Sequence, residues 1–194
     1  MIKSQIRKDI KQLRLSLSPQ EIAAASKRIA EFVISAPWYV NAKTLMLYLP
    51  IKNEADTSYI MSHALQNGKT VALPITNHAD FSLSCACITS SDDLTDGVFN
   101  TKEPDAAKAK PILPSEIDLV IVPALAFDRC GFRVGYGKGC YDRFLPSVRP
   151  DCVKAGINYS FAIVDKIEAS PHDVRMDYII TENEIIIPAD AIFD

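Results

Sequence analysis

Residues 117–145 read IDLVIVPALAFDRCGFRVGYGKGCYDRFL, and this stretch decides the fold. Its apolar run Leu119–Val122 has the length and composition of a strand that is buried on both faces. A loop is predicted from Asp128 to Gly139, and a short helix begins at Tyr141. A loop that connects the carboxyl end of a parallel strand to a helix is the usual place for a ligand in α/β proteins.

Helical and strand patterns alternate along the rest of the chain. Apolar residues at helical spacing predict a helix over residues 2–17, with Leu13 on its apolar face, and a second over 18–35, where Ser18 and Glu21 form a capping box. A third helix is predicted over 57–66. Strands are predicted at residues 44–49, 70–73, 81–88, 119–122, 153–157 and 178–181, and residues 90–114 are predicted to cross the surface irregularly. The alternation predicts an α/β domain with a mostly parallel sheet.

The composition excludes several classes of protein. The 194 residues are 48% apolar and 23% charged, which suits one sizeable core without extensive disorder. A net charge of −3 gives no basic excess for nucleic-acid binding. No apolar run approaches the ~20 residues of a membrane span, and the basic segment Met1–Arg14 lacks the apolar core of a signal peptide. We therefore expect a cytoplasmic protein with neither nucleic acid nor membrane as a partner.

The five cysteines do not suggest a disulfide framework, because their number is odd and their spacing scattered. Cys85 and Cys87 alternate within a predicted strand and would share one face. A metal site would need further ligands at fixed spacing, and the sequence shows none. Burial as small apolar side chains is the favoured interpretation.

Three alternating glycines, Gly135, Gly137 and Gly139, make the loop a candidate anion site. Glycine permits left-handed backbone and a close approach to a ligand, and free N–H groups before a helix attract anions. The loop is neither a Walker A motif, since Gly139 rather than serine or threonine follows Lys138, nor a G-x-G-x-x-G dinucleotide fingerprint. A purely structural glycine-rich turn is the alternative.

Around this loop the chain closely resembles the 5-formyltetrahydrofolate cyclo-ligase family, also called methenyltetrahydrofolate synthetases. The loop is the most specific part of the resemblance. Other matching segments, in the same order as in the family, are Lys3–Arg7, Leu49–Pro50, Glu54–Thr57, Gly68–Pro74, Glu103–Pro104, Ile117–Pro123, Ala126–Asp128, Pro171–Val174, Asp177 and Thr181–Glu182. The resemblance implies one cyclo-ligase domain over residues 1–194, with a three-layer α/β/α fold similar to the sugar-phosphate isomerase and CoA-transferase-like group.

The resemblance also implies a reaction between small molecules. In the family, MgATP phosphorylates the formyl oxygen of 5-formyltetrahydrofolate, and N10 of the folate then attacks the activated carbon. Phosphate leaves, and 5,10-methenyltetrahydrofolate and ADP are the other products. The expected co-substrate is ATP, the expected cofactor is Mg²⁺, and the expected state is a monomer. Such a protein acts mainly by positioning and charge stabilisation.

Two segments match the family's ATP-binding positions. They comprise Lys3, Ser4, Gln5, Ile6 and Arg7 near the N-terminus, and Arg133, Val134, Gly135, Tyr136, Gly137, Lys138, Gly139, Cys140 and Tyr141 in the loop. Lys138 is expected to be catalytic, because it can stabilise charge on the transferred phosphoryl group. Lys3 and Arg7 share a helical face, for which an ordinary solvated basic surface is the alternative. Lys11 and Arg14 have no motif match and are expected at the surface.

Further matches concern the metal and the folate. Asp142 and Asp173 match magnesium-binding positions, and carboxylate and phosphate oxygens suit such a hard cation. A helix N-terminal carboxylate and a turn residue are the respective alternatives. The substrate-binding matches are Leu49, Glu54, Tyr136, Gly137, Lys138, Gly139 and Cys140. A carboxylate such as Glu54 can accept hydrogen bonds from pterin N–H groups, although a simple loop residue is the alternative.

Three positions depart from the family pattern. Cys140 stands where tyrosine is common, Ala124 where glycine is frequent, and Ala162 where glutamine is common. These departures concern the pocket rather than the phosphate loop.

Two other functions remain as alternatives: a non-catalytic folate- or nucleotide-binding protein, and an ATP-independent enzyme of the wider fold group.

Overall fold

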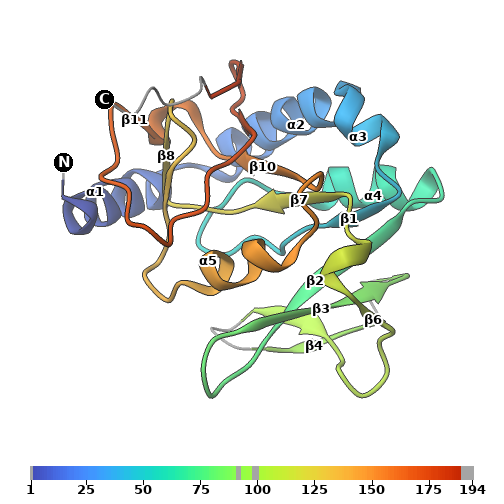
Figure 1. Ribbon diagram of the computed structural model, residues 1–194. Coiled ribbons are helices and arrows are strands. Elements are labelled where there is room, and N and C mark those ends of the chain that lie inside the picture. Colours follow the sequence, from blue (N-terminus) through green and yellow to red (C-terminus); the bar gives the residue numbers. More distant parts are fainter. Residues whose placement is uncertain (1, 91–92, 98–100, 189–194) are drawn as a thin grey trace.

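An eight-stranded sheet forms the centre of the protein (Figure 1). The structure, a computed structural model, describes residues 2–90, 93–97 and 101–188. In order across the sheet the strands are β13 (Ile185–Ile186), β12 (Tyr178–Ile180), β10 (Val153–Ile157), β7 (Leu119–Val122), β1 (Thr44–Met46), β2 (Thr70–Thr76), β3 (Leu83–Ile88) and β6 (Pro111–Ile112).

The middle of this sheet is parallel, which confirms the sequence prediction. Strands β12, β10, β7, β1 and β2 pair in parallel. Antiparallel pairs lie only toward the two sides, where β13 joins β12 and where β3 joins β2 and β6. All four residues of β7 are buried, and a strand covered on both faces needs apolar side chains on both.

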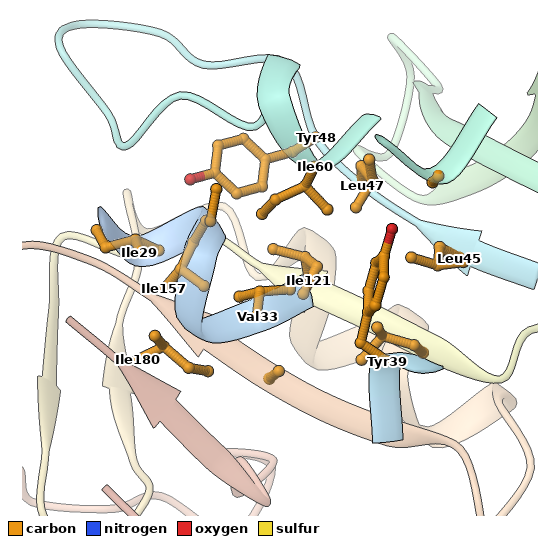
Figure 2. Packing of buried hydrophobic residues seen from close by; sticks show 14 of the residues in the cluster. Ile29, Val33, Tyr39, Leu45, Leu47, Tyr48, Ile60, Ile121, Ile157 and Ile180 are labelled. Atoms are coloured by element: carbon orange, nitrogen blue, oxygen red, sulfur yellow. The ribbon is translucent and has the colours of Figure 1, made fainter. Parts of the chain in front are cut away.

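Three helices cover one face of the sheet: α2 (Pro19–Ser35), α3 (Pro37–Asn41) and α4 (Ser58–Gln66). Figure 2 shows Val33 of α2, Tyr39 of α3 and Ile60 of α4 packed around Leu45 and Ile121 of the sheet. The capping box at the start of α2 is confirmed, since the Glu21 N–H donates to Ser18 Oγ over 3.3 Å. Among the described helices, none has the length and apolarity that a membrane crossing requires.

The opposite face of the sheet carries a second core. Met46, Val120 and Val122 point to this side and pack with Phe144 and Leu145. The two latter residues belong to the short helix α5 (Cys140–Phe144) and to the 3₁₀ turn that follows it, Leu145–Ser147. The predicted α/β/α layering is therefore present, with a thin second helical layer.

The first helix, α1 (Lys3–Leu15), packs on a separate three-stranded sheet. That sheet consists of β11 (Ile163–Val164), β8 (Ala126–Asp128) and β9 (Arg133–Val134). Ile6 and Ile10 of α1 are buried against Ala126 and Val134. Because β9 leads directly into the glycine-rich loop, this packing fixes α1 beside the loop.

Two predictions about α1 are wrong. Leu13, which was expected on the apolar face, is 49% exposed, whereas Arg14, which was expected at the surface, is 1% exposed. The buried row of α1 consists of Ile6, Ile10 and Arg14, each four residues from the next. The helical period therefore places Arg14 where an apolar residue would continue the row.

The segment 90–114 is more regular than the sequence predicted. Its described part contains the antiparallel pair β4 (Leu94–Asp96) and β5 (Lys102–Pro104), as well as β6, while residues 91–92 and 98–100 lie outside the described part. Glu103 of β5 is buried and accepts hydrogen bonds from the Thr76 N–H (2.9 Å) and the Thr101 hydroxyl (3.2 Å). These strands have too few apolar residues for periodicity to reveal them.

Strand ends also differ from expectation. β2 continues through Pro74, because only Thr70–Ala72 pair with β1 and the missing N–H of the proline therefore breaks no bond on that side. β3 begins at Leu83, because Phe81 adopts φ 59°, which belongs to a turn rather than a strand. The loop predicted over 128–139 contains the two-residue strand β9.

The five cysteines are all free. Cys85 is buried in the second core, where burial raises the pKa of its thiol to about 11. Cys87 is partly buried and packs against the same cluster, so the two thiols share one face as predicted. The burial predicted for this pair is therefore complete for Cys85 and partial for Cys87.

Gly156 of β10 provides a test of the packing between the two sheets. A Cβ at this position would overlap the ring of Phe127 on β8. We expect Gly156→Ala to lower the free energy of unfolding by about 1–3 kcal/mol, the usual range for an overpacked core. Urea unfolding followed by circular dichroism measures this difference.

Gly135→Ala is the matched control, because a Cβ there would meet no atom within 4 Å. Its effect should stay within ~1 kcal/mol and can be stabilising. Equal losses in the two variants would contradict the packing described for Gly156.

Candidate active site

A cavity of about 530 Å³ lies between the carboxyl ends of the parallel strands and the glycine-rich loop. Its lining includes Leu49 beyond β1, Pro123 beyond β7, the C-terminal half of β2 and residues 133–142. The volume is typical of small-molecule sites, which span roughly 300–1,000 Å³. This is the edge of the sheet at which the sequence predicted a ligand.

Most of the predicted site residues meet at this one cavity. It is lined by Lys3, Arg7, Leu49, Glu54, Arg133, Val134, Gly135, Tyr136, Gly137, Lys138, Gly139, Cys140, Tyr141, Asp142 and Asp173. These residues come from widely separated parts of the chain, and only the fold brings them together. Their individual roles in binding remain predictions.

Three predicted ATP-binding residues, Ser4, Gln5 and Ile6, do not line the cavity. Ser4 and Gln5 are exposed, and Ile6 is buried between α1 and the small three-stranded sheet. The reason is helical geometry: residues four apart share a face, so Lys3 and Arg7 face the cavity while the residues between them turn away. The next residue of the same stripe, Lys11, is exposed as expected and also lines the cavity.

The glycine-rich loop has the backbone that its sequence suggests. Gly137 has φ +100° and Gly139 has φ +66°, conformations that other residues rarely adopt. Arg7 Nε donates to the Gly135 carbonyl over 2.9 Å, so α1 and the loop are directly joined. The helix after the loop, α5, has only five residues, so its dipole adds little to anion binding.

Lys138 lies at the outer edge of the cavity. Its Nζ is 4.5 Å from the centre of the Phe81 ring, a cation–π contact with the turn before β3. Arg143 fixes this edge by donating to the carbonyls of Lys138 (3.0 Å), Asp80 (2.9 Å) and Phe81 (2.9 Å). An exposed cation is thus held on a well-anchored loop.

Two cation–carboxylate pairs form the wall beside the loop. Arg133 Nη2 lies 2.6 Å from Asp142 Oδ1, and Lys3 Nζ lies 2.7 Å from Asp173 Oδ2. Partial burial would raise the pKa of Asp173, but hydrogen bonds from Lys3 and the Ser170 N–H outweigh it and hold the pKa below its usual value. Asp173 is therefore suited to remain a carboxylate at neutral pH.

A magnesium ion would find oxygen ligands here, but not a complete shell. The described residues contain no group of three or more His, Cys, Asp or Glu side chains that could hold a metal. Asp142 and Asp173 both line the cavity, and Mg²⁺ typically takes one or two carboxylates together with phosphates and water. The residues fit an ion that arrives with a phosphate ligand and competes with Arg133 and Lys3 for these oxygens.

At another part of the wall, Glu54 forms a buried ion pair with Arg14, which does not itself line the cavity. Their side chains are 5% and 2% exposed, and Arg14 Nη1 lies 3.4 Å from Glu54 Oε1. The Tyr136 hydroxyl donates to the same oxygen over 3.2 Å, and the Ile51 N–H donates to Oε2 over 3.1 Å. Burial raises the pKa of Glu54, while Arg14 and these donors pull it back only in part.

Sequence reasoning missed several residues of the site. Lys52 lines the cavity beside Lys11, and the two Nζ atoms lie 5.5 and 5.4 Å from the Tyr136 ring centre. Glu103 lines the wall formed by β5. Arg14 had a detectable signal in its spacing from Ile6 and Ile10. Glu103 lay in a segment that matched the family but had no assigned role, and Lys52 had no signal.

The buried hydroxyl of Tyr141 has no hydrogen-bond partner among the described residues. An unsatisfied buried hydroxyl costs ~1–3 kcal/mol, and such groups gather at sites that bind ligands. Tyr141 lines the cavity next to Cys140, where burial raises the pKa of the thiol. A polar group of a ligand could therefore satisfy this hydroxyl.

The three departures from the family pattern have different consequences. Cys140 lines the cavity, so the presence of cysteine in place of the tyrosine common in the family affects the pocket directly. Ala124 is buried, and its carbonyl accepts a hydrogen bond from Arg14 over 2.6 Å. Ala162 is buried in the cluster beneath α1 and does not line the cavity.

The chain is similar to known proteins in both sequence and fold. The sequence profile of the 5-formyltetrahydrofolate cyclo-ligase family matches residues 1–182. A mitochondrial 5-formyltetrahydrofolate cyclo-ligase from Arabidopsis thaliana is 31% identical over 210 residues, covering 96% of this chain and 74% of that protein.

Solved structures show the same fold. The 5,10-methenyltetrahydrofolate synthetase of Aquifex aeolicus has a TM-score of 0.84 and 31% identity, with 98% of this chain and 95% of that chain covered. The synthetase of Mycoplasma pneumoniae has a TM-score of 0.77 and 28% identity, with 94% and 99% covered. Together with the profile match, these similarities show that the chain belongs to the 5-formyltetrahydrofolate cyclo-ligase family of enzymes.

Proposed function

We propose that this protein catalyses the ATP- and magnesium-dependent cyclisation of 5-formyltetrahydrofolate to 5,10-methenyltetrahydrofolate, with release of ADP and phosphate. The observation that carries the proposal is one cavity that joins a cationic glycine-rich loop to a buried carboxylate, Glu54. The first feature suits a polyphosphate and the second suits the N–H donors of a pterin. The reaction requires both ligands at once.

The phosphates of ATP are assigned to the loop and to α1. Arg7 already donates to the Gly135 carbonyl, so its guanidinium lies beside the backbone that would wrap the phosphates. Lys138 would leave the Phe81 ring and move to the transferred phosphoryl group, where a positive charge stabilises the transition state. Exchange of a cation–π contact worth ~0.5–1 kcal/mol for a phosphate contact is favourable.

The folate is assigned to the pocket of Leu49, Glu54 and Tyr136. Glu54 would accept hydrogen bonds from the pterin amine and ring N–H, which orients the formyl group toward the loop. When bound through Asp142 and Asp173, Mg²⁺ would neutralise phosphate charge and hold the phosphates in line. The chain's own part is to place the formyl oxygen and the phosphoryl group in one water-poor cavity.

The surroundings in which the protein acts are also proposed. We infer that it works as a monomer in the cytoplasm on small molecules, without nucleic acid or membrane partners. The net charge of −3 supports the lack of a nucleic-acid partner.

An absorbance assay tests the reaction directly. Protein, magnesium, ATP and 5-formyltetrahydrofolate are mixed, and the near-ultraviolet absorbance of the methenyl product is followed. Product that forms only with ATP supports the proposal. Product formed without ATP would favour an ATP-independent enzyme of the fold group, and binding without product would favour a non-catalytic binding protein.

Lys138→Ala is expected to lower kcat by about 100-fold, because removal of one transition-state charge contact typically has that effect. The unfolding free energy should change by less than ~0.5 kcal/mol, since the side chain is exposed. Lys27→Ala, which removes an exposed lysine of α2, is the control and should leave kcat unchanged. Equal turnover in both variants would remove Lys138 from the mechanism.

Asp142→Asn is expected to raise the magnesium concentration at half-maximal rate by at least about tenfold, equivalent to ~1.4 kcal/mol of metal binding. The loss of a carboxylate ligand is the physical reason. Asp165→Asn, at an exposed position outside the cavity, controls for net charge. A magnesium titration that coincides with that of the unsubstituted protein would exclude Asp142 as a ligand.

A further inference from the structure

We infer that Arg14 is a positioning residue that fixes the Glu54 carboxylate as an acceptor for the pterin N–H groups of the substrate. The inference rests on the proposed function and extends it to a residue outside the motifs that carry the family resemblance. Arg14 lies behind Glu54 and does not line the cavity, so it acts through Glu54 rather than by touching the substrate.

Four segments of the chain meet at the Arg14 guanidinium. Its hydrogen bonds run from Nη1 to Glu54 Oε1 (3.4 Å) and to the Tyr136 hydroxyl (3.3 Å), and from Nη2 to the Ala124 carbonyl (2.6 Å) and Asn158 Oδ1 (3.2 Å). The Asn158 amide in turn donates to the carbonyls of Ala124 (3.1 Å) and Leu125 (3.0 Å). The guanidinium is therefore anchored to the frame of the fold, and Glu54 is placed relative to it.

Glu54 keeps acceptor capacity for a ligand. A carboxylate offers about four lone-pair positions. Three donors are present: Arg14 and Tyr136 on Oε1 and the Ile51 N–H on Oε2. The Arg14 bond is long, so the two groups interact mainly through charge, and Oε2 remains the oxygen with room for a further donor.

The groups that face Glu54 explain why its charge depends on Arg14. Tyr48, Tyr136, Tyr141 and Tyr159 surround it, and burial raises the pKa of each, so they are neutral hydroxyls. Lys11 and Lys52 lie over the Tyr136 ring. Burial raises the pKa of Glu54, and Arg14 is the largest of the influences that lower it.

Loss of Arg14 would thus raise the pKa of Glu54 further. A protonated Glu54 has fewer acceptor positions and no negative charge for the pterin donors. In the pH profile of kcat/KM, the rise in rate on the acid side reports ionisation of Glu54 in the free enzyme. This acid limb should then move to higher pH. The buried Nε of Arg14 has no hydrogen-bond partner among the described residues. The burial of this arginine therefore leaves one donor unsatisfied.

The test is the pH dependence of kcat/KM for 5-formyltetrahydrofolate in the unsubstituted enzyme, Arg14→Met and Arg14→Lys. Arg14→Met should raise KM for the folate by about 10- to 100-fold, the size expected for a charged hydrogen bond. The acid limb should shift to higher pH, while KM for ATP changes little. Arg14→Lys should restore part of the folate affinity and move the limb back toward its original position.

Glu54→Gln completes a double-mutant cycle. It should abolish the acid limb, and Arg14→Met should have little further effect on the folate KM in this background. An equal effect of Arg14→Met with and without Glu54 would overturn the inference, as would a limb that persists in Glu54→Gln. Arg14→Gln, which keeps polar contacts without charge, replaces Arg14→Met if that variant does not fold.

Lys8→Met is the matched control, because it removes an exposed positive charge from the same helix. Its folate KM and pH profile should equal those of the unsubstituted protein. If the unsubstituted protein forms the methenyl product and the Arg14 variants match it, only the Arg14 inference fails. If the unsubstituted protein forms no product with ATP, the proposed function fails and the inference falls with it.

Discussion

The packing of Ile6 and Ile10 of α1 against the small three-stranded sheet is the constraint on which the site depends. It places the basic stripe of Lys3, Arg7 and Lys11 along the cavity wall. The same sheet contains β9, which leads into the glycine-rich loop. One helix–sheet contact therefore sets the distance between the cations of α1 and the backbone of the loop, and the Arg7–Gly135 hydrogen bond joins them.

The charges of the site are arranged as pairs. Lys3 pairs with Asp173, Arg133 with Asp142 and Arg14 with Glu54. In the first two pairs the carboxylate is partly open to solvent, which weakens the pairing. The third is buried, where loss of one partner leaves an uncompensated charge, so it suits a fixed role. Two partly open pairs thus lie beside the loop, and a buried pair holds the Glu54 carboxylate.

The sequence predicted the parallel centre of the sheet and the position of the cavity, because both follow from apolar runs and from a strand–loop–helix pattern. It did not predict the short strands β4, β5 and β6, which lack a periodic apolar signal. The burial of Arg14 was also not predicted, because arginine is normally exposed. Its spacing from Ile6 and Ile10 nevertheless continues the buried row of α1. Ser4, Gln5 and Ile6 matched a motif as a continuous segment, but a helix turns such neighbours to different sides.

We propose that one cavity binds the nucleotide phosphates at the glycine-rich loop and the pterin at Glu54. A crystal structure of the protein with magnesium, ADP and 5-formyltetrahydrofolate tests it most directly. We expect a phosphate in hydrogen-bond contact with the backbone of residues 135–139 and with Arg7, and a pterin N–H donating to Glu54. A nucleotide bound away from the loop, or a pterin without contact to Glu54, would contradict it.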